Sequence, residues 1–157
     1  MSKTTPATLM LSRIGVPFTL ATYDYDAGAE RVGLQAAEAM GVAPAIVLKT
    51  LMVEVDGKPG CVVVPSDQEV NMKKVAAAFG AKSAQMMKPA DAERLTGYKV
   101  GGISPFGQRK AVPTALEEMA TLEDEIFLNG GQRGLQIRMR PDDLVQVLQA
   151  KVADLIR

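Results

Sequence analysis

One turn in the first half of the chain does most to limit the possible folds. Residues 46–55 are rich in aliphatic and β-branched side chains and predict a strand, Asp56-Gly57 is a hairpin signal, and residues 60–64 predict the returning strand. Two strands joined by so short a turn are antiparallel, which excludes a strictly parallel, doubly wound sheet. Because predicted helices alternate with other strands, the sequence predicts an α+β fold with a mixed, curled or barrel-like sheet and flanking helices.

The rest of the pattern predicts helices and short strands in alternation. Helices are expected at 6–14, 34–40, 71–79, 89–95 and 141–156, and strands at 18–23, 84–87, 110–112, 126–128 and 135–139. No repeat, low-complexity tract or linker divides the 157 residues, which predicts a single domain over 1–157. No apolar run reaches the roughly 18 residues that a membrane span needs. No apolar stretch follows Lys3 either, so we expect no signal peptide.

The chain contains no His and only one Cys, Cys61. The first absence excludes Ser-His-Asp and Cys-His catalysis and every His-containing metal site, and the second excludes Cys-rich zinc sites and an intrachain disulfide. No glycine-rich phosphate loop follows the first strand, so we expect no nucleotide cofactor. The carboxylates form no recurring pair at a loop junction, so we also expect no metal. Cys61 is expected to be a buried, inert thiol, and a reducing cytoplasm is the expected compartment.

The charges balance overall but are unevenly distributed. The 18 basic and 18 acidic side chains cancel, yet residues 71–114 carry eight basic and two acidic ones. Residues 1–70 and 115–157 each carry five basic and eight acidic side chains. Such a basic block predicts an anionic partner that docks on one side of the molecule. The alternative is an ordinary solvated Lys/Arg surface.

Lys49 is the first residue that could carry chemistry. Strand alternation puts it on the face of Val47, Leu51 and Val53, where burying an ammonium group is costly. It could donate hydrogen bonds to a carbonyl or a phosphate in a pocket. Alternatively, its aliphatic stem covers apolar surface at a strand edge while the charged end reaches water.

Two glycine-rich segments are candidates for recognition. Segment 101–107, Gly-Gly-Ile-Ser-Pro-Phe-Gly, allows positive φ and close backbone approach, so consecutive N–H groups could point at one anion or carbonyl. Segment 129–134, Asn-Gly-Gly-Gln-Arg-Gly, offers backbone donors, an amide and an Arg that could bind phosphate. Alternatively, segment 101–107 is only a turn, and segment 129–134 is only a β-hairpin loop.

These features together resemble a known family. The strand segment Val-Leu-Lys-Thr-Leu at 47–51, the segment 97–107 and the segment 129–135 resemble, in order and spacing, the YbaK-type aminoacyl-tRNA deacylases, free-standing relatives of the editing domain of bacterial prolyl-tRNA synthetase. The resemblance spans nearly the whole chain. It implies hydrolytic editing of mischarged tRNA, typically Cys-tRNA(Pro). It also implies catalytic roles for Lys49 and Gly101, and a substrate pocket formed by Tyr23, Gly102, Ile103, Ser104, Asn129, Gly130 and Gly131.

The mechanism proposed for cysteine-specific relatives suits a chain without His. The thiol of the substrate attacks its own ester carbonyl, so the protein needs only to position groups and to supply donors for the oxyanion. We expect the backbone of Gly101 and Gly102 to hold the carbonyl and Lys49 to bind the terminal adenosine phosphate or the ester. The expected tRNA contacts are Lys73, Lys74, Lys82, Lys88, Lys99, Arg109, Lys110 and Arg133. A ternary complex with prolyl-tRNA synthetase is a further expected partnership.

Three positions depart from the family pattern. Asn129 stands where cysteine-specific relatives often carry Ser, Gln136 where they often carry Asp, and Val32 where a pocket aromatic is expected. Two alternatives therefore remain. One is a deacylase for another small amino acid, such as alanine or serine. The other is a non-catalytic module that binds aminoacyl-tRNA or a synthetase.

Overall fold

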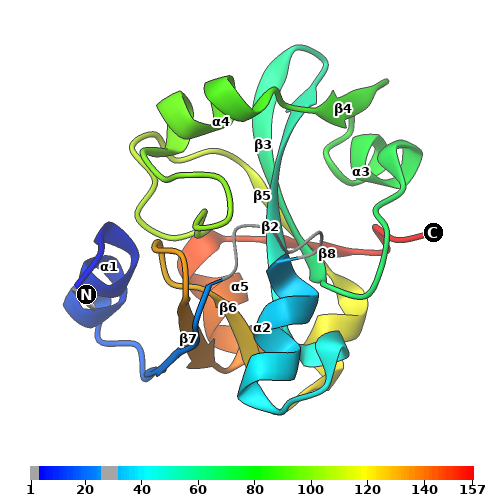
Figure 1. Cartoon of the computed structure of the whole chain (residues 1–157). Coiled ribbons are helices and arrows are strands. Elements are labelled where there is room, and N and C mark those ends of the chain that lie inside the picture. The colour runs from blue at the N-terminus through cyan, green and yellow to red at the C-terminus, as the bar shows by residue number, and fades with distance from the viewer. Residues whose placement is uncertain (1–3, 26–31) are drawn as a thin grey trace.

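Two β-sheets frame the computed structural model, which describes residues 4–25 and 32–157 (Figure 1). One is antiparallel with the order β1-β7-β6, formed by Thr19–Thr22, Leu135–Met139 and Ile126–Asn129. The other is mixed with the order β4-β2-β3-β5-β8, formed by Ala84–Met86, Leu48–Val55, Lys58–Pro65, Thr114–Glu117 and Lys151–Ala153. The α+β prediction is confirmed. Within the described residues neither sheet closes into a barrel, although a parallel bridge between Val47 and Phe127 links them.

The β2–β3 hairpin has the geometry that its turn residues predict. Asp56 and Gly57 both have positive φ, at 49° and 79°, as a two-residue turn between right-twisted strands requires. The Asp56 carboxylate also accepts hydrogen bonds from the backbone N–H groups of Lys82 and Ser83, the latter at 3.0 Å. The turn is thereby tied to the segment that leads into β4.

Short helices cover the sheets (Figure 1). The α-helices are α1 (Pro6–Ile14), α2 (Val32–Met40), α3 (Met72–Ala78), α4 (Pro89–Thr96) and α5 (Pro141–Leu148), and the 3₁₀ turns are η1 (Pro44–Ile46) and η2 (Glu118–Leu122). Thr5 caps α1 by accepting from the N–H of Thr8, and Asn71 caps α3 in the same way. In the described part of the chain, no helix has both the length and the apolar character that crossing a membrane would take.

The β2–β3 hairpin is buried on both faces. Leu48 and Met52 pack on one side in the cluster that includes Cys61, whereas Val53 and Val55 pack on the other. Two-sided burial makes the hairpin the rigid centre of the larger sheet. Cys61 is fully buried, as predicted, and this burial raises the pKa of its thiol to about 12.

The prediction of a strand at 110–112 is wrong. The ladder begins later, at β5, which pairs in parallel with β3 from Thr114 opposite Cys61. Pro113 immediately precedes it and has no N–H to donate, but its carbonyl accepts from the N–H of Cys61 at 2.9 Å. The pairing therefore starts at this proline and not before it.

The long final helix predicted at 141–156 is also wrong. Helix α5 ends at Leu148 because Gln149 adopts a left-handed conformation with φ of 52°. The chain then forms β8, which pairs in parallel with β5. Leu155, expected on the apolar face of the helix, is indeed buried, but in an extended segment.

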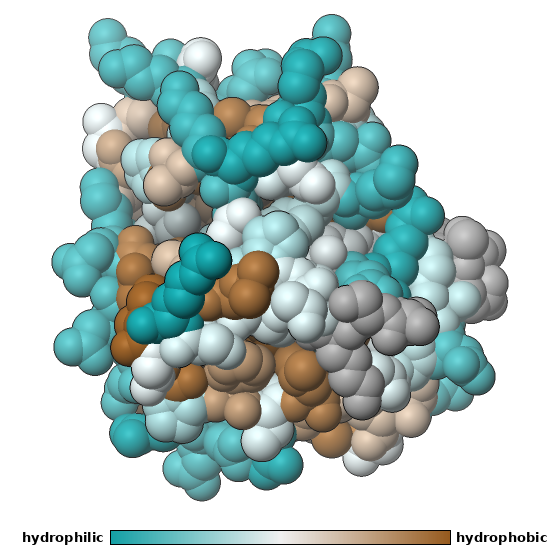
Figure 2. Space-filling model, turned by 90° about the vertical axis from the view of Figure 1, so that its left-hand side faces the viewer, coloured by the Kyte–Doolittle hydropathy of each residue, from teal (hydrophilic) through white to brown (hydrophobic). Residues whose placement is uncertain are grey.

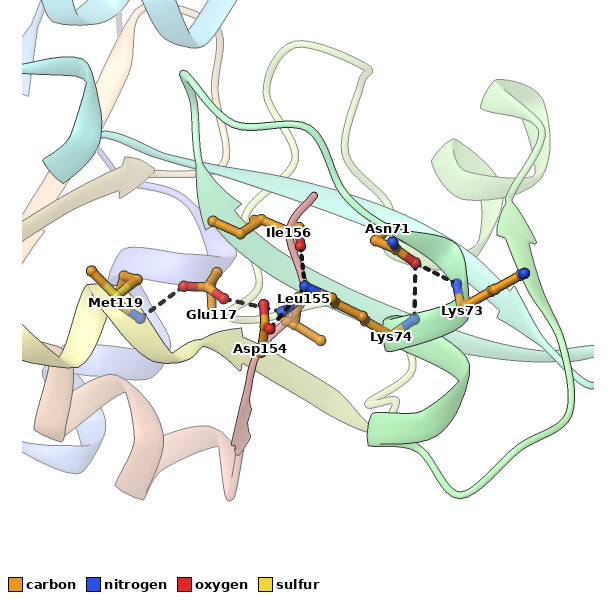
Figure 3. Close-up of polar contacts among 8 residues, drawn as sticks. All are labelled: Asn71, Lys73, Lys74, Glu117, Met119, Asp154, Leu155 and Ile156. Atoms are coloured by element: carbon orange, nitrogen blue, oxygen red, sulfur yellow. Dashed lines mark hydrogen bonds and ion pairs between the residues drawn. The ribbon is translucent and has the colours of Figure 1, made fainter.

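Contacts with distant parts of the chain hold this extended C-terminal segment in place (Figure 3). The ammonium group of Lys74 donates to the Asp154 carboxylate at 2.8 Å and to the Ile156 carbonyl at 2.7 Å. Asn71 donates its backbone N–H to the Leu155 carbonyl at 2.8 Å. Tertiary hydrogen bonds therefore outweigh the helical periodicity of these residues.

Candidate functional site

A cleft of about 450 Å³ opens beside the first half of β2. Strand β4 pairs only with Val53, Glu54 and Val55, so among the described strands none pairs with residues 48–51 on this side. Side chains from both faces of β2 can therefore reach the cleft. Lys49 and Thr50, which point to opposite faces of the strand, both line it.

The cleft combines an apolar wall with a few polar groups, as small-molecule sites usually do. Its apolar residues are Leu48, Leu51, Met52, Met86, Met87, Pro89, Ala92, Val100 and Ile103. Its polar side chains are Lys49, Thr50, Ser66, Gln68, Glu69, Asn129 and Gln136, and Gly101 adds backbone groups. Four of the residues predicted from sequence, Lys49, Gly101, Ile103 and Asn129, thus meet at one cleft although they come from three separate segments.

Asn129 joins the two glycine-rich segments at the cleft. Its amide nitrogen donates to the Gly101 carbonyl at 3.1 Å. Its amide oxygen accepts from the N–H groups of Gly131 and Gln132, at 2.7 and 3.2 Å. One side chain therefore holds the segment after α4 against the β6–β7 loop.

The backbone N–H groups of the 101–107 segment are not equivalent. The N–H of Gly102 donates to the Lys99 carbonyl at 2.8 Å. The hydrogen bonds of the described residues include none from the N–H of Gly101 or of Ile103, and both residues line the cleft. The turn at Gly101, with φ of 89°, therefore leaves the N–H groups of Gly101 and Ile103, and not that of Gly102, without an acceptor among the described residues.

Other predicted pocket residues lie behind the cleft wall. Ser104 is fully buried, with its hydroxyl accepting from the Phe106 N–H at 3.3 Å. The Gly130 carbonyl accepts from the Thr5 hydroxyl at 2.5 Å. A Cβ at Gly131 would lie 2.8 Å from the Tyr98 ring, so this glycine permits close packing.

Tyr23 lies in a separate apolar cluster with Ala36, Ala37 and Phe127, and it is not among the residues that line the cleft. Burial, and then the neighbouring Tyr25, raise the pKa of its phenol. The side chain of Val32 lies outside the described residues.

The predicted tRNA contacts fall into two groups. The first group is exposed and forms no ion pair or side-chain hydrogen bond within the described residues: Lys73, Lys82, Lys88, Lys99, Arg109 and Lys110. Arg133 is exposed too, but it belongs to the second group. The other group is already engaged within the protein. Lys74 bonds to Asp154, and Arg133 donates its Nε–H to the Val100 carbonyl at 3.0 Å. Helix α4, flanked by Lys88 and Lys99, contributes Pro89 and Ala92 to the cleft wall, which brings these two exposed cations near it.

Several polar residues of the cleft are not predicted from the sequence. Ser66, Gln68 and Glu69 follow directly after β3, where a polar stretch behind a buried strand is a signal for function. The sequence places Thr50 only within the strand and the family segment at 47–51, and Gln136 only as a departure from a family pattern. Both have a buried side-chain oxygen without a hydrogen-bond partner among the described residues. Among the described residues, no group of three or more His, Cys, Asp or Glu side chains could hold a metal ion.

A second hollow lies beside α1, lined by Leu9, Met10, Arg13 and Ile14 among others. Leu9 and Ile14 are exposed apolar side chains. Figure 2 faces this side of the molecule and shows apolar side chains gathered next to hydrophilic ones. The hollow contains none of the predicted catalytic or substrate-binding residues, so the cleft beside β2 is the candidate site.

Comparisons with known proteins show which family this chain belongs to. Residues 31–147 match the model of the aminoacyl-tRNA editing domain. The chain is 38% identical over 121 residues to EbsC of Enterococcus faecalis, to which Cys-tRNA(Pro)/Cys-tRNA(Cys) deacylase activity is attributed, and the match covers 76% of this chain and 73% of EbsC. It is 24% identical over 153 residues to the multifunctional Ser/Thr-tRNA deacylase ProXp-y of Escherichia coli K12, with coverage of 94% and 89%. A 32% match over 90 residues covers 57% of this chain and 16% of a proline–tRNA ligase of Acidithiobacillus ferrooxidans.

Solved structures show the same fold. A protein described as a trans-editing enzyme for prolyl tRNA synthetase superposes with a TM-score of 0.85 at 22% identity, covering 97% of this chain and 95% of that one. The protein APE2540 superposes with a TM-score of 0.86 at 22% identity, covering 98% and 100%. Since the family model matches most of the sequence and EbsC is 38% identical across most of both chains, the chain belongs to the aminoacyl-tRNA editing domain family.

Proposed function

We propose that residues 1–157 form one editing domain that acts in trans as a deacylase on mischarged aminoacyl-tRNA, with Cys-tRNA(Pro) as its main substrate. The observation that carries the proposal is that Lys49 and Gly101 line the same cleft. The apolar wall suits a small side chain, and the cations Lys88 and Lys99 beside α4 suit the phosphates of a tRNA end. The activity attributed to EbsC supports the choice of amino acid.

In the proposed reaction the substrate supplies its own nucleophile. The cysteine sulfur attacks the ester carbonyl carbon, a C–S bond forms, the C–O bond to the tRNA 3′ end breaks, and the thiol proton passes to the leaving oxygen. The Gly101 N–H stabilises the oxyanion, and the Lys49 ammonium binds the terminal phosphate or the ester. Removing one oxyanion donor typically costs about 100–1000-fold in rate.

A panel of mischarged tRNAs tests this function. We expect the protein to cleave Cys-tRNA(Pro), Lys49→Ala to lose most of this activity, and Lys58→Ala, at the far end of the same hairpin, to keep it. Full activity of Lys49→Ala would contradict the role of Lys49. Binding of aminoacyl-tRNA without turnover would identify a non-catalytic module instead.

The amino acid specificity has a second candidate, serine or alanine. Asn129 and Gln136 at the cleft and the similarity to ProXp-y favour it. The same panel decides between the two. A serine ester should react poorly if the substrate thiol attacks, whereas equal rates for cysteine and serine esters would indicate an attacking water.

The proposed setting is the cytoplasm, in complex with tRNA and prolyl-tRNA synthetase. The match to a stretch that makes up 16% of a proline–tRNA ligase supports the link to that synthetase. Sedimentation of the protein with tRNA(Pro), with and without the synthetase, tests the ternary complex. A sedimentation coefficient that the synthetase does not change would contradict it.

A further inference from the structure

We infer that Arg133 is a positioning residue for deacylation: by holding the Val100 carbonyl it fixes the orientation of the Gly101 N–H at the cleft. This inference rests on the proposed function, and it replaces the tRNA-phosphate contact that the sequence predicted for Arg133. It follows from three observations on the backbone around Gly101.

The first observation is the shared peptide group. The carbonyl of Val100 and the N–H of Gly101 belong to one planar, trans unit, so they point in opposite directions and turn together. Arg133 Nε donates to this carbonyl at 3.0 Å. A contact on the carbonyl side therefore sets the direction of the N–H, which has no acceptor among the described residues.

The second observation is that the next peptide group is held at both ends. The Gly101 carbonyl accepts from Asn129 at 3.1 Å, and the Gly102 N–H donates to Lys99 at 2.8 Å. Without Arg133, neither end of the Val100–Gly101 peptide would have a hydrogen-bond partner among the described residues, so this peptide could rotate next to the positive-φ glycine. Glycine lacks the Cβ that would otherwise restrict such rotation.

The third observation is that Arg133 is itself held in place. Its guanidinium carbon lies 5.3 Å from the centre of the Tyr25 ring, which is cation–π distance. Its backbone nitrogen packs so closely on Gly102 that a Cβ there would lie 2.9 Å away. Arginine suits this role because its Nε–H has a fixed direction in a planar group, which a lysine ammonium cannot reproduce.

The two roles for Arg133 predict different kinetics. A phosphate contact would act on binding, so its loss would raise KM and reduce the salt dependence of tRNA binding. An aligned oxyanion donor acts mainly in the transition state, so its loss should lower kcat with little change in KM.

The test is steady-state deacylation of Cys-tRNA(Pro) by the full chain and two variants. We expect Arg133→Gln and Arg133→Lys each to lower kcat by about 10-fold or more, with KM within about twofold of wild type. Arg140→Gln, an exposed site before α5, is the control for loss of an arginine. Near-normal kcat in Arg133→Lys together with a raised KM in Arg133→Gln would overturn the inference in favour of a phosphate contact.

A second readout does not depend on catalysis. Backbone ¹⁵N relaxation should show the Gly101 amide as rigid in the wild-type protein, with an order parameter of about 0.85, and as mobile in Arg133→Lys, below about 0.6. The amides of Cys61 and Leu128, both in the core, should not change. An unchanged Gly101 order parameter would overturn the inference. A wild-type protein that cleaves no ester in the panel would instead overturn the proposed function.

Discussion

The backbone N–H of Leu155 donates to the carboxylate of Glu117 at 3.0 Å, in the interior of the protein (Figure 3). The other oxygen of Glu117 accepts from the N–H of Met119 at 2.8 Å. Glu117 is fully buried, and its one carboxylate satisfies two backbone donors, of which the Leu155 N–H is buried and the Met119 N–H is partly buried. This contact attaches the C-terminal segment to the end of β5.

Replacing Glu117 should therefore destabilise the protein strongly. Glu117→Ala leaves both N–H groups without an acceptor, at a cost of about 1–3 kcal/mol for each group that remains buried. Urea unfolding at neutral pH measures the difference. Glu118→Ala is the matched control, since its neighbouring side chain is exposed, and it should stay within about 0.5 kcal/mol of wild type. Equal stability of the two variants would refute the assigned role of the buried carboxylate.

The hydrogen bonds to the Asp56 carboxylate should make the free energy of unfolding depend on pH in the acidic range. Hydrogen bonds from the N–H groups of Lys82 and then Ser83 hold the pKa of the Asp56 carboxyl below its usual value near 4. A pKa lowered by folding stabilises the native state above the pKa of the unfolded chain, and this contribution is lost as pH falls through the lowered value. The advantage of wild type over Asp56→Asn should therefore shrink between about pH 5 and pH 3.

Denaturant unfolding across this pH range measures that advantage. Asp56→Asn suits the purpose because asparagine also tolerates the left-handed conformation of the turn. An advantage for Asp56 that does not vary with pH would count against the hydrogen bonds as its source.

Local signals made the hairpin and most of the elements predictable. Asp56-Gly57 specifies its turn through its own conformational preferences, and Thr5 and Asn71 cap helices a few residues away. The last helix could not be predicted correctly, because the bonds from Glu117 and Lys74 that hold 151–157 extended come from far along the chain. The local hydrophobic periodicity does not reveal such distant partners.

The candidate site was predictable in its residues but not in its shape. Lys49 stood out as a charge on an apolar strand, and the paired glycines stood out by composition. That Thr50 joins Lys49 at the cleft depends on where β4 stops pairing with β2, which only the tertiary structure shows. The engagement of Arg133 with Val100 likewise depends on how two loops pack.

The close packing of these loops predicts a sensitive glycine. Gly102 has an ordinary backbone conformation, but a Cβ there would lie 2.9 Å from the backbone nitrogen of Arg133, a contact that forces the loops apart. Gly102→Ala should therefore lower the deacylation rate. Gly60→Ala, whose Cβ would meet only side chains at 3.4 Å or more, should retain activity and serves as the control. Initial rates on Cys-tRNA(Pro) make the comparison, and equal activity of both variants would show that the loops accommodate the methyl group.

The basic residues should differ in how much they contribute to tRNA binding. Arg109 and Lys110 are exposed, whereas Lys74 is bonded to Asp154 and to the Ile156 carbonyl. Each phosphate contact that is removed reduces the slope of log Kd against log salt by roughly 0.7–0.9. Arg109→Gln and Lys110→Gln should each do so, while Lys74→Gln should leave the slope unchanged and lower the free energy of unfolding. Fluorescence anisotropy with labelled tRNA(Pro) over a series of salt concentrations gives the slopes, and urea unfolding gives the stabilities.

Wild-type binding that does not respond to salt would remove the basic block from the tRNA interface. A slope in Lys74→Gln reduced as much as in Lys110→Gln would show that Lys74 leaves Asp154 to bind phosphate.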